Sequence, residues 1–134
     1  MRYKDFEGTL EELVEQKLQE IEEKEHVRIL HAVESGSRSW GFASPDSDYD
    51  VRFIYVRRPE DYLKLEPARD VIEWELDETL DINGWDLQKA LRQYHRSNST
   101  LFEWANSPVV YRTTEEWRQI HQAASVYFSE KAAM

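Results

Sequence analysis

The apolar residues at the start of the chain recur at helical spacing. Thr9 followed by Glu12 has the spacing of a capping box, in which the first side chain accepts a hydrogen bond from the backbone of the second. Five apolar residues then recur every three or four positions: Leu10, Leu13, Val14, Leu18 and Ile21. Charged residues lie between them, so the pattern predicts an amphipathic helix over residues 9–25.

Four later segments have the composition of strands and are bounded by turn residues: 27–35, 48–56, 71–76 and 79–83. The last two are separated only by Asp77-Glu78, which favours pairing as a hairpin. In residues 48–56, apolar and charged positions alternate. One face carries Tyr49, Val51, Phe53 and Tyr55, and the other carries Asp48, Asp50 and Arg52. We expect the first face to pack under a helix.

The rest of the chain favours helices and loops. From Trp85 the period becomes helical, with one stripe formed by Leu87, Ala90, Leu91 and Tyr94. We predict a short helix at residues 99–106 and a last helix that begins at Thr113 or Thr114. Residues 59–65 fit a loop or a short helix, and residues 109–112 fit no single class.

Composition narrows the class of protein. The chain has 134 residues, which suits one domain with one core. Its net charge of −10 opposes nonspecific binding to DNA or to an anionic membrane surface. It has no cysteine, which excludes disulfides and thiolate metal sites, and no apolar run long enough to span a bilayer. We expect a cytoplasmic protein.

The paired carboxylates of Asp48 and Asp50 are the first candidate for chemistry. Alternate residues of a strand share a face and lie roughly 7 Å apart along it. Two carboxylates held this close repel one another unless a cation lies between them. Mg²⁺ prefers such hard oxygen ligands and completes its shell with phosphate oxygens and water. The pair therefore predicts a divalent metal site.

Gly36-Ser37, where the first predicted strand ends, is the second candidate. Glycine allows close approach of the backbone to an anion, and N–H groups at the start of a helical turn bind phosphate oxygens. Ser37 adds a hydroxyl donor. A phosphate cradle shortly before a metal-binding pair is what phosphoryl or nucleotidyl transfer needs.

These motifs resemble those of the DNA polymerase beta-like nucleotidyltransferase superfamily. Its signature is Gly followed by Gly or Ser, about ten residues, and Asp-x-Asp, which Gly36-Ser37 and Asp48-Tyr49-Asp50 match. The third carboxylate of the superfamily is flanked by apolar residues, as Asp81 is in Leu80-Asp81-Ile82. Longer stretches, at residues 36–42, 47–55 and 84–91, are similar to the bacterial and phage RNA repair pathway polymerase-beta family.

The resemblance implies an α/β (α+β) fold like the polymerase beta palm. Its small mixed sheet would carry Asp48 and Asp50 on one strand and Asp81 on the neighbouring strand, with helices on the opposite face. It also implies transfer of a nucleotide from a nucleoside triphosphate to a hydroxyl of RNA or protein, with two Mg²⁺ or Mn²⁺ ions. Family members are longer than this chain, so we expect residues 1–134 to be a catalytic domain that ends before a C-terminal helical region.

Each assignment has an alternative. An EF-hand loop is excluded, because Val51 stands where its sharp turn needs Gly. Asp77, Glu78 and Asp86 compete with Asp81 as the third carboxylate, although Asp86 is better placed to cap the helix that follows. We predict that Arg38 and Lys89 contact the triphosphate, with a surface salt bridge as the alternative for each. The four histidines show no ligand spacing. The alternative for the whole protein is a non-catalytic, antitoxin-like or regulatory module that binds a nucleotide or a partner.

Overall fold

The computed structural model describes residues 8–35, 49–66, 68–75, 80–95 and 107–133. In chain order the elements are α1 (Leu10–Glu25), β1 (Val27–Glu34), β2 (Tyr49–Arg57), α2 (Pro59–Tyr62), β3 (Val71–Glu75), β4 (Leu80–Asp86), α3 (Leu87–His95), β5 (Val110–Thr113) and α5 (Glu115–Ala133). The predicted helices and strands are confirmed in the described residues, except that β4 continues to Asp86, past the predicted end at residue 83 and into the segment predicted to be helical. The short helix predicted for residues 99–106 lies outside the described residues.

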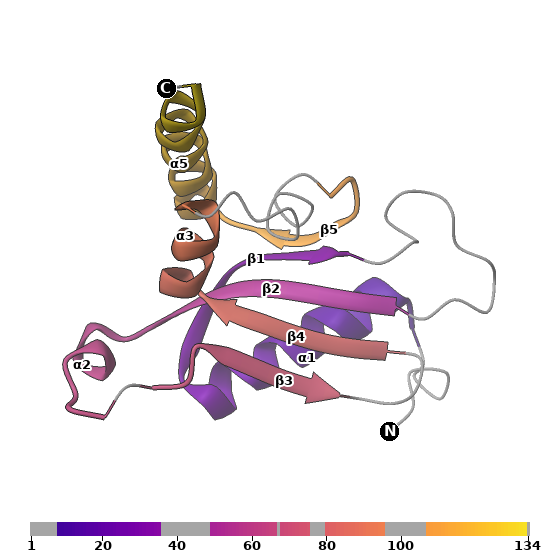
Figure 1. Cartoon of the computed structure of the whole chain (residues 1–134). Helices are drawn as coiled ribbons and strands as arrows, with labels where there is room; N and C mark the ends of the chain where they lie inside the picture. Colours follow the sequence, from indigo (N-terminus) through magenta and orange to yellow (C-terminus); the bar gives the residue numbers. More distant parts are fainter. Residues whose placement is uncertain (1–7, 36–48, 67, 76–79, 96–106, 134) are drawn as a thin grey trace.

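The strands form one mixed sheet of five strands in the order β3-β4-β2-β1-β5 (Figure 1). Neighbouring strands are antiparallel except β2 and β4, which are parallel. The predicted hairpin of β3 and β4 is confirmed, with Glu75 opposite Asp81 and Val71 opposite Trp85. Because β2 and β4 run in the same direction, the first residues of both strands lie at the same end of the sheet.

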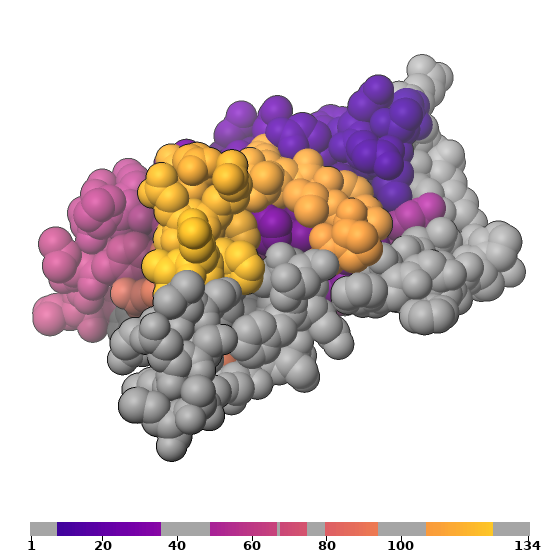
Figure 2. Space-filling model, turned by 90° about the horizontal axis from the view of Figure 1, so that it is seen from above, coloured from indigo at the N-terminus to yellow at the C-terminus, as the bar shows by residue number. Residues whose placement is uncertain are grey.

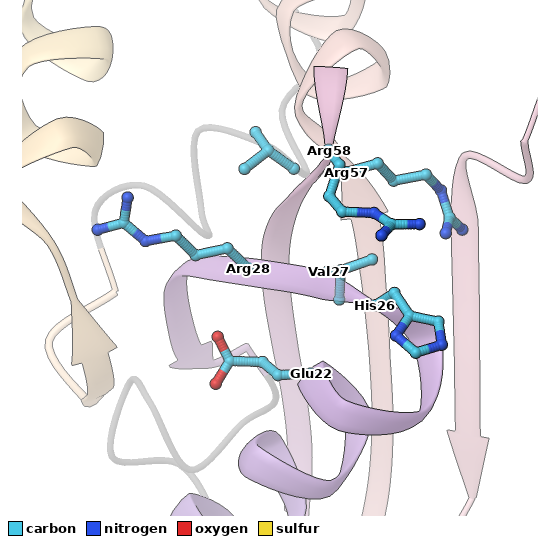
Figure 3. A pocket seen from close by; sticks show the side chains of 7 residues that line it. Glu22, His26, Val27, Arg28, Arg57 and Arg58 are labelled. Carbon is cyan, nitrogen blue, oxygen red and sulfur yellow. The ribbon is translucent and has the colours of Figure 1, made fainter. Parts of the chain in front are cut away.

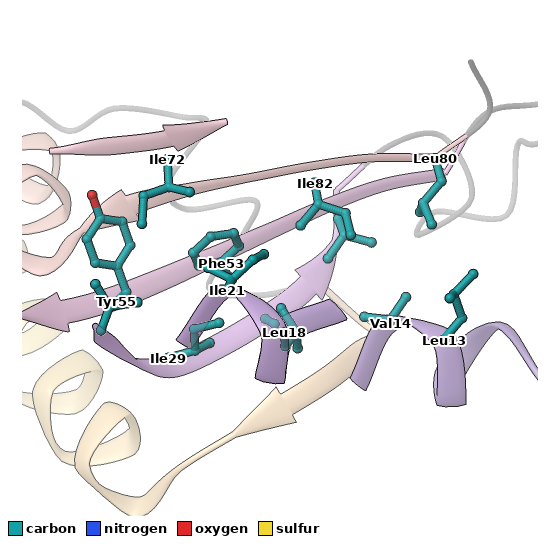
Figure 4. Packing of buried hydrophobic residues seen from close by; sticks show 13 residues of the cluster. Leu13, Val14, Leu18, Ile21, Ile29, Phe53, Tyr55, Ile72, Leu80 and Ile82 are labelled. Carbon is teal, nitrogen blue, oxygen red and sulfur yellow. The ribbon is translucent and has the colours of Figure 1, made fainter. Parts of the chain in front are cut away.

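Helix α1 covers one face of the sheet (Figure 1). Thr9 caps it as predicted, because its Oγ1 accepts the N–H of Glu12 at 3.2 Å. The apolar stripe of α1 packs on the alternate residues of β2 that were predicted to face a helix, Val51, Phe53 and Tyr55. Figure 4 shows this cluster, in which Leu18 and Ile21 lie between the strands and the helix axis. The main core therefore lies between α1 and the sheet.

Helices α3 and α5 pack on the opposite face, which is also the face of Asp50 and Arg52. Their cluster includes Ile54 of β2, Ala90 of α3 and Trp117 of α5. Helices were expected on the face opposite the carboxylates, where α1 lies, and α3 and α5 cover part of the second face as well. Since Ile54 follows Arg52 on the same face, these helices cover the far end of that face and leave the end near Asp50 partly exposed.

Two further helix starts have side-chain caps. Asp86, the last residue of β4, accepts the N–H of Gln88 at 2.8 Å, which confirms its prediction as a helix cap. Thr114 accepts the N–H of Trp117 at 3.2 Å and starts α5. In the space-filling view, β5 and the first part of α5 lie side by side at the surface (Figure 2). None of the helices in the described ranges is both long and apolar enough to cross a membrane.

Candidate metal and nucleotide site

Two of the three predicted carboxylates lie directly opposite one another. Asp50 of β2 and Asp81 of β4 are partners in the parallel β2–β4 ladder. Strands in a sheet are about 4.8 Å apart, and opposite residues point to the same face. Both side chains are 35% exposed. The sheet therefore brings together two carboxylates that are distant in sequence and leaves both open to solvent.

Arg52 lies between these carboxylates. Its Nη2 is 3.1 Å from Oδ2 of Asp81 and 3.8 Å from Oδ1 of Asp50, and its side chain is only 18% exposed. Nη1 also donates to the backbone oxygen of Val51 at 2.9 Å. The guanidinium group thus supplies the cation that two adjacent carboxylates need.

Asn83 is the next residue of β4 on the same face. Its Nδ2 lies 3.3 and 3.4 Å from the two carboxylate oxygens of Asp81. The carboxylates of Asp50 and Asp81 thus lie around one positive charge, and the amide of Asn83 contacts the carboxylate of Asp81. Such a donor set fits Mg²⁺ or Mn²⁺, which favour carboxylate and other oxygen ligands.

The remaining predicted site residues are only partly described. Asp48, Gly36, Ser37 and Arg38 lie outside the described residues. The described part of the chain holds no group of three acidic, histidine or cysteine side chains with metal-binding geometry. Lys89, on α3, places its Nζ 5.3 Å from the centre of the Trp85 ring, so its ammonium group contacts an aromatic face.

Glu34 is a residue of this site that the sequence reasoning missed. It is the last residue of β1 and is 1% exposed. Its Oε2 accepts the backbone N–H of Asp50 at 2.8 Å, and its Oε1 accepts the hydroxyl of Tyr111 at 2.8 Å. The available signal was an acidic residue at the end of a mostly apolar strand, directly before Ser35-Gly36-Ser37.

The backbone around Glu34 is also held on both sides. Its N–H donates to the backbone oxygen of Val109 at 3.0 Å, and its own backbone oxygen accepts the hydroxyl of Ser107 at 2.6 Å. The N–H of Ser35 donates to the backbone oxygen of Asp50 at 2.9 Å. Burial and the charge of Glu34 raise the pKa of Tyr111, which keeps this hydroxyl protonated as a donor.

A hollow of about 410 Å³ lies elsewhere, where β1 begins and β2 ends (Figure 3). It is lined by Glu22, His26, Val27, Arg28, Val56, Arg57 and Arg58. Its three arginines already have partners: Glu116 for Arg28, Asp61 for Arg58, and the backbone oxygens of Glu25 and Arg69 for Arg57. Because β2 separates this hollow from Asp50 by most of its length, it is not part of the carboxylate site.

Comparison with known proteins supports the resemblance found in the sequence. Residues 10–134 match the RNA repair pathway DNA polymerase beta family. The chain is also 50% identical over 111 residues to "Uncharacterized protein YcgL" of Bacillus subtilis (strain 168), covering 80% of this chain and 43% of that protein. The chain thus spans less than half the length of this relative. No solved structure matches. The chain belongs to the RNA repair pathway DNA polymerase beta family and is a nucleotidyltransferase-like protein.

Proposed function

We propose that this protein is a metal-dependent nucleotidyltransferase that transfers a nucleoside monophosphate from a nucleoside triphosphate to a hydroxyl group and releases pyrophosphate. The observation that carries this proposal is the placement of Asp50 opposite Asp81, with Arg52 between them. Membership of a polymerase beta family supports the same chemistry. A purely structural ion pair would not require two carboxylates on one cation.

In this proposal Asp48, Asp50 and Asp81 hold two Mg²⁺ or Mn²⁺ ions. Bound there, the ions would supply positive charge to the attacking and departing oxygens. Gly36 and Ser37 would bind the β- and γ-phosphates through backbone N–H groups and the serine hydroxyl. Arg38 and Lys89 are proposed as further phosphate contacts.

The bond changes are those of an in-line displacement at phosphorus. The oxygen of the acceptor hydroxyl forms a bond to the α-phosphorus while the bond from that phosphorus to the α,β-bridging oxygen breaks. The hydroxyl proton passes to the carboxylate of Asp81, and pyrophosphate leaves. Asp50 would hold an ion against the oxygens of the α-phosphate and so keep that phosphate in line with the acceptor.

The acceptor is proposed to be an RNA end or a protein hydroxyl. The description of the family names RNA repair, which makes an RNA hydroxyl the first acceptor to test. With a net charge of −10, the chain would have to contact RNA through a local surface rather than through its overall charge.

The proposal is tested by incubating the protein with each α-³²P-labelled nucleoside triphosphate and Mg²⁺ or Mn²⁺. The acceptors are an RNA oligonucleotide with a free 3′-hydroxyl and, separately, a ribonuclease-treated cell protein extract. We expect label on one acceptor and release of pyrophosphate, both abolished by chelation and by Asp50→Asn. Glu23→Gln, an exposed carboxylate change on α1, is the matched control and should keep full activity.

Two results would contradict the proposal. Transfer that persists in Asp50→Asn would remove the metal site from the reaction. Triphosphate binding by the wild type without transfer to either acceptor would favour the non-catalytic binding module.

A further inference from the structure

We infer that Glu34 and Tyr111 are positioning residues that fix Asp50, and therefore its carboxylate, in the orientation that binds a divalent ion. This inference rests on the proposed function, because it assigns a purpose to a network that touches a proposed metal ligand. Both residues act through the backbone of Asp50, whose N–H donates to Glu34.

The main link is the hydrogen bond from the Asp50 N–H to the Glu34 carboxylate. The β1–β2 ladder ends at the pair Glu34 and Val51, so the next N–H of β2 is bound by a side chain instead of by the backbone of β1. The backbone oxygen of Asp50 in turn accepts the N–H of Ser35. The backbone N–H and the backbone oxygen of Asp50 are therefore both hydrogen-bonded to residues 34–35, which directly precede Gly36-Ser37.

The second link joins this carboxylate to the edge strand β5. Tyr111 donates its hydroxyl to Oε1 of Glu34, while Oε2 holds Asp50, so the tyrosine determines how the carboxylate is turned. Tyr111 is itself packed against the α1 core. The position of Asp50 therefore depends on a rigid chain of contacts from the core through β5.

The cost of this arrangement argues against a role in packing alone. Burying a carboxylate at 1% exposure removes it from water, which is unfavourable unless strong hydrogen bonds compensate. An apolar side chain at the end of β1 would avoid that cost. A buried anion with donors on both oxygens instead gives a fixed geometry, as groups that orient metal ligands do elsewhere.

The test uses Mn²⁺ binding to the 134-residue chain, measured by the electron paramagnetic resonance signal of free Mn²⁺. Glu34→Ala should weaken Mn²⁺ binding roughly tenfold or more, which is the usual effect of removing a group that orients a ligand. Tyr111→Phe should weaken it less. Glu34→Gln should stay near the wild type, because its amide oxygen still accepts the Asp50 N–H and its NH₂ donates to the oxygen of Tyr111.

Tyr55→Phe is the matched control for Tyr111→Phe. It also removes a buried hydroxyl with a hydrogen bond, to the backbone oxygen of Arg69 at 3.0 Å, but this bond lies at the other end of β2. If the network acts only on stability, both variants will lower the melting temperature and will bind Mn²⁺ with the same affinity. If it positions Asp50, only Tyr111→Phe will weaken binding. This comparison decides the question even if Glu34→Ala does not fold.

The outcomes separate the two proposals. Wild-type affinity in Tyr111→Phe and Glu34→Ala, together with weakened binding in Asp50→Asn, would overturn the positioning role and leave the metal site standing. Equal losses in Tyr111→Phe and Tyr55→Phe would also overturn it. Absence of Mn²⁺ binding by the wild type, or unchanged binding in Asp50→Asn, would overturn both the metal site and this inference.

Discussion

Asp50 and Asp81 share one cation, the guanidinium group of Arg52, across the parallel β2–β4 ladder. The contact with Asp81 is the shorter, at 3.1 Å against 3.8 Å for Asp50. Since the three side chains lie on one face of two adjacent strands, the sheet fixes the spacing of their backbones. The arrangement stabilises the two carboxylates without a metal and also means that a divalent ion must compete with an arginine.

Replacement of Arg52 tests this competition. Arg52→Ala removes the resident cation, so the repulsion between Asp50 and Asp81 should lower the melting temperature of the metal-free protein. The same repulsion should tighten Mn²⁺ binding several-fold, because the ion then supplies the only counter-charge between them. Isothermal titration with Mn²⁺ measures the second effect. Weaker Mn²⁺ binding in Arg52→Ala would show that the arginine supports the ion instead of competing with it.

Asp81 and Asp86 lie on the same strand, and their substitution should have different effects. Asp81→Ala should slow transfer by about 100-fold or more, because it removes the proposed proton acceptor, while the fold is retained. Asp86→Ala removes the cap on Gln88 and a 2.9 Å hydrogen bond from Tyr62, so it should cost about 1–3 kcal/mol of stability.

Single-turnover transfer and urea unfolding separate the two variants. Loss of transfer in a folded Asp86→Ala protein, with normal transfer in Asp81→Ala, would reverse the assignment of the third carboxylate.

Gly84 is the point where β4 passes close to an aromatic ring of the core. It is the ladder partner of Phe53, and a Cβ at this position would overlap the Phe53 ring. Gly84→Ala should therefore destabilise the protein by about 1–3 kcal/mol through overpacking. The cost should be smaller when measured in a Phe53→Leu background, since the smaller side chain leaves room. Additive effects of the two substitutions would show that the ring is not the obstacle.

The alkaline stability of the protein should depend on Tyr55. Burial raises its pKa to about 12 from the ordinary tyrosine value of 10.0. Between these values the unfolded chain has lost the proton and the folded chain retains it, so stability is full below pH 10 and falls as the pH rises toward 12. This one group contributes a slope of about 1.4 kcal/mol per pH unit.

Urea unfolding of the wild type and Tyr55→Phe between pH 9 and 12 measures this slope. The variant should be less stable at pH 9 and lose stability less steeply above pH 10. Parallel curves would indicate that Tyr55 titrates normally in the folded protein.

Local patterns in the sequence predicted much of the fold. The capping box at Thr9 and Glu12 and the alternation in β2 each depend on neighbouring residues, and both are confirmed. Trp85 was predicted to begin a helix, but β4 continues through Asp86. The strand ends at Asp86, whose carboxylate caps α3. Trp85 packs against the cluster that contains residues of α3 and α5.

The family resemblance implied that the strand of Asp81 lies beside the strand of Asp50, as it does, but the side-chain contacts of the site were less accessible to sequence reasoning. Alternation placed Asp50 and Arg52 on one face, but no local pattern specifies that Arg52 turns toward Asp81. Glu34 acquires its role from a tyrosine on β5, a strand of only four residues whose class the sequence left open. Strand order and buried side-chain hydrogen bonds are products of tertiary packing, so these contacts required the structure.

The most direct test of the metal site is a crystal of this protein grown with Mn²⁺ and a non-hydrolysable nucleoside triphosphate, with anomalous diffraction used to locate manganese. We expect manganese coordinated by carboxylate oxygens of both Asp50 and Asp81, with two ions roughly 4 Å apart and the triphosphate bound beside them. We also expect Arg52 to have moved away from at least one of the two carboxylates. Manganese and triphosphate bound elsewhere, with Arg52 still between Asp50 and Asp81, would contradict the proposed metal site.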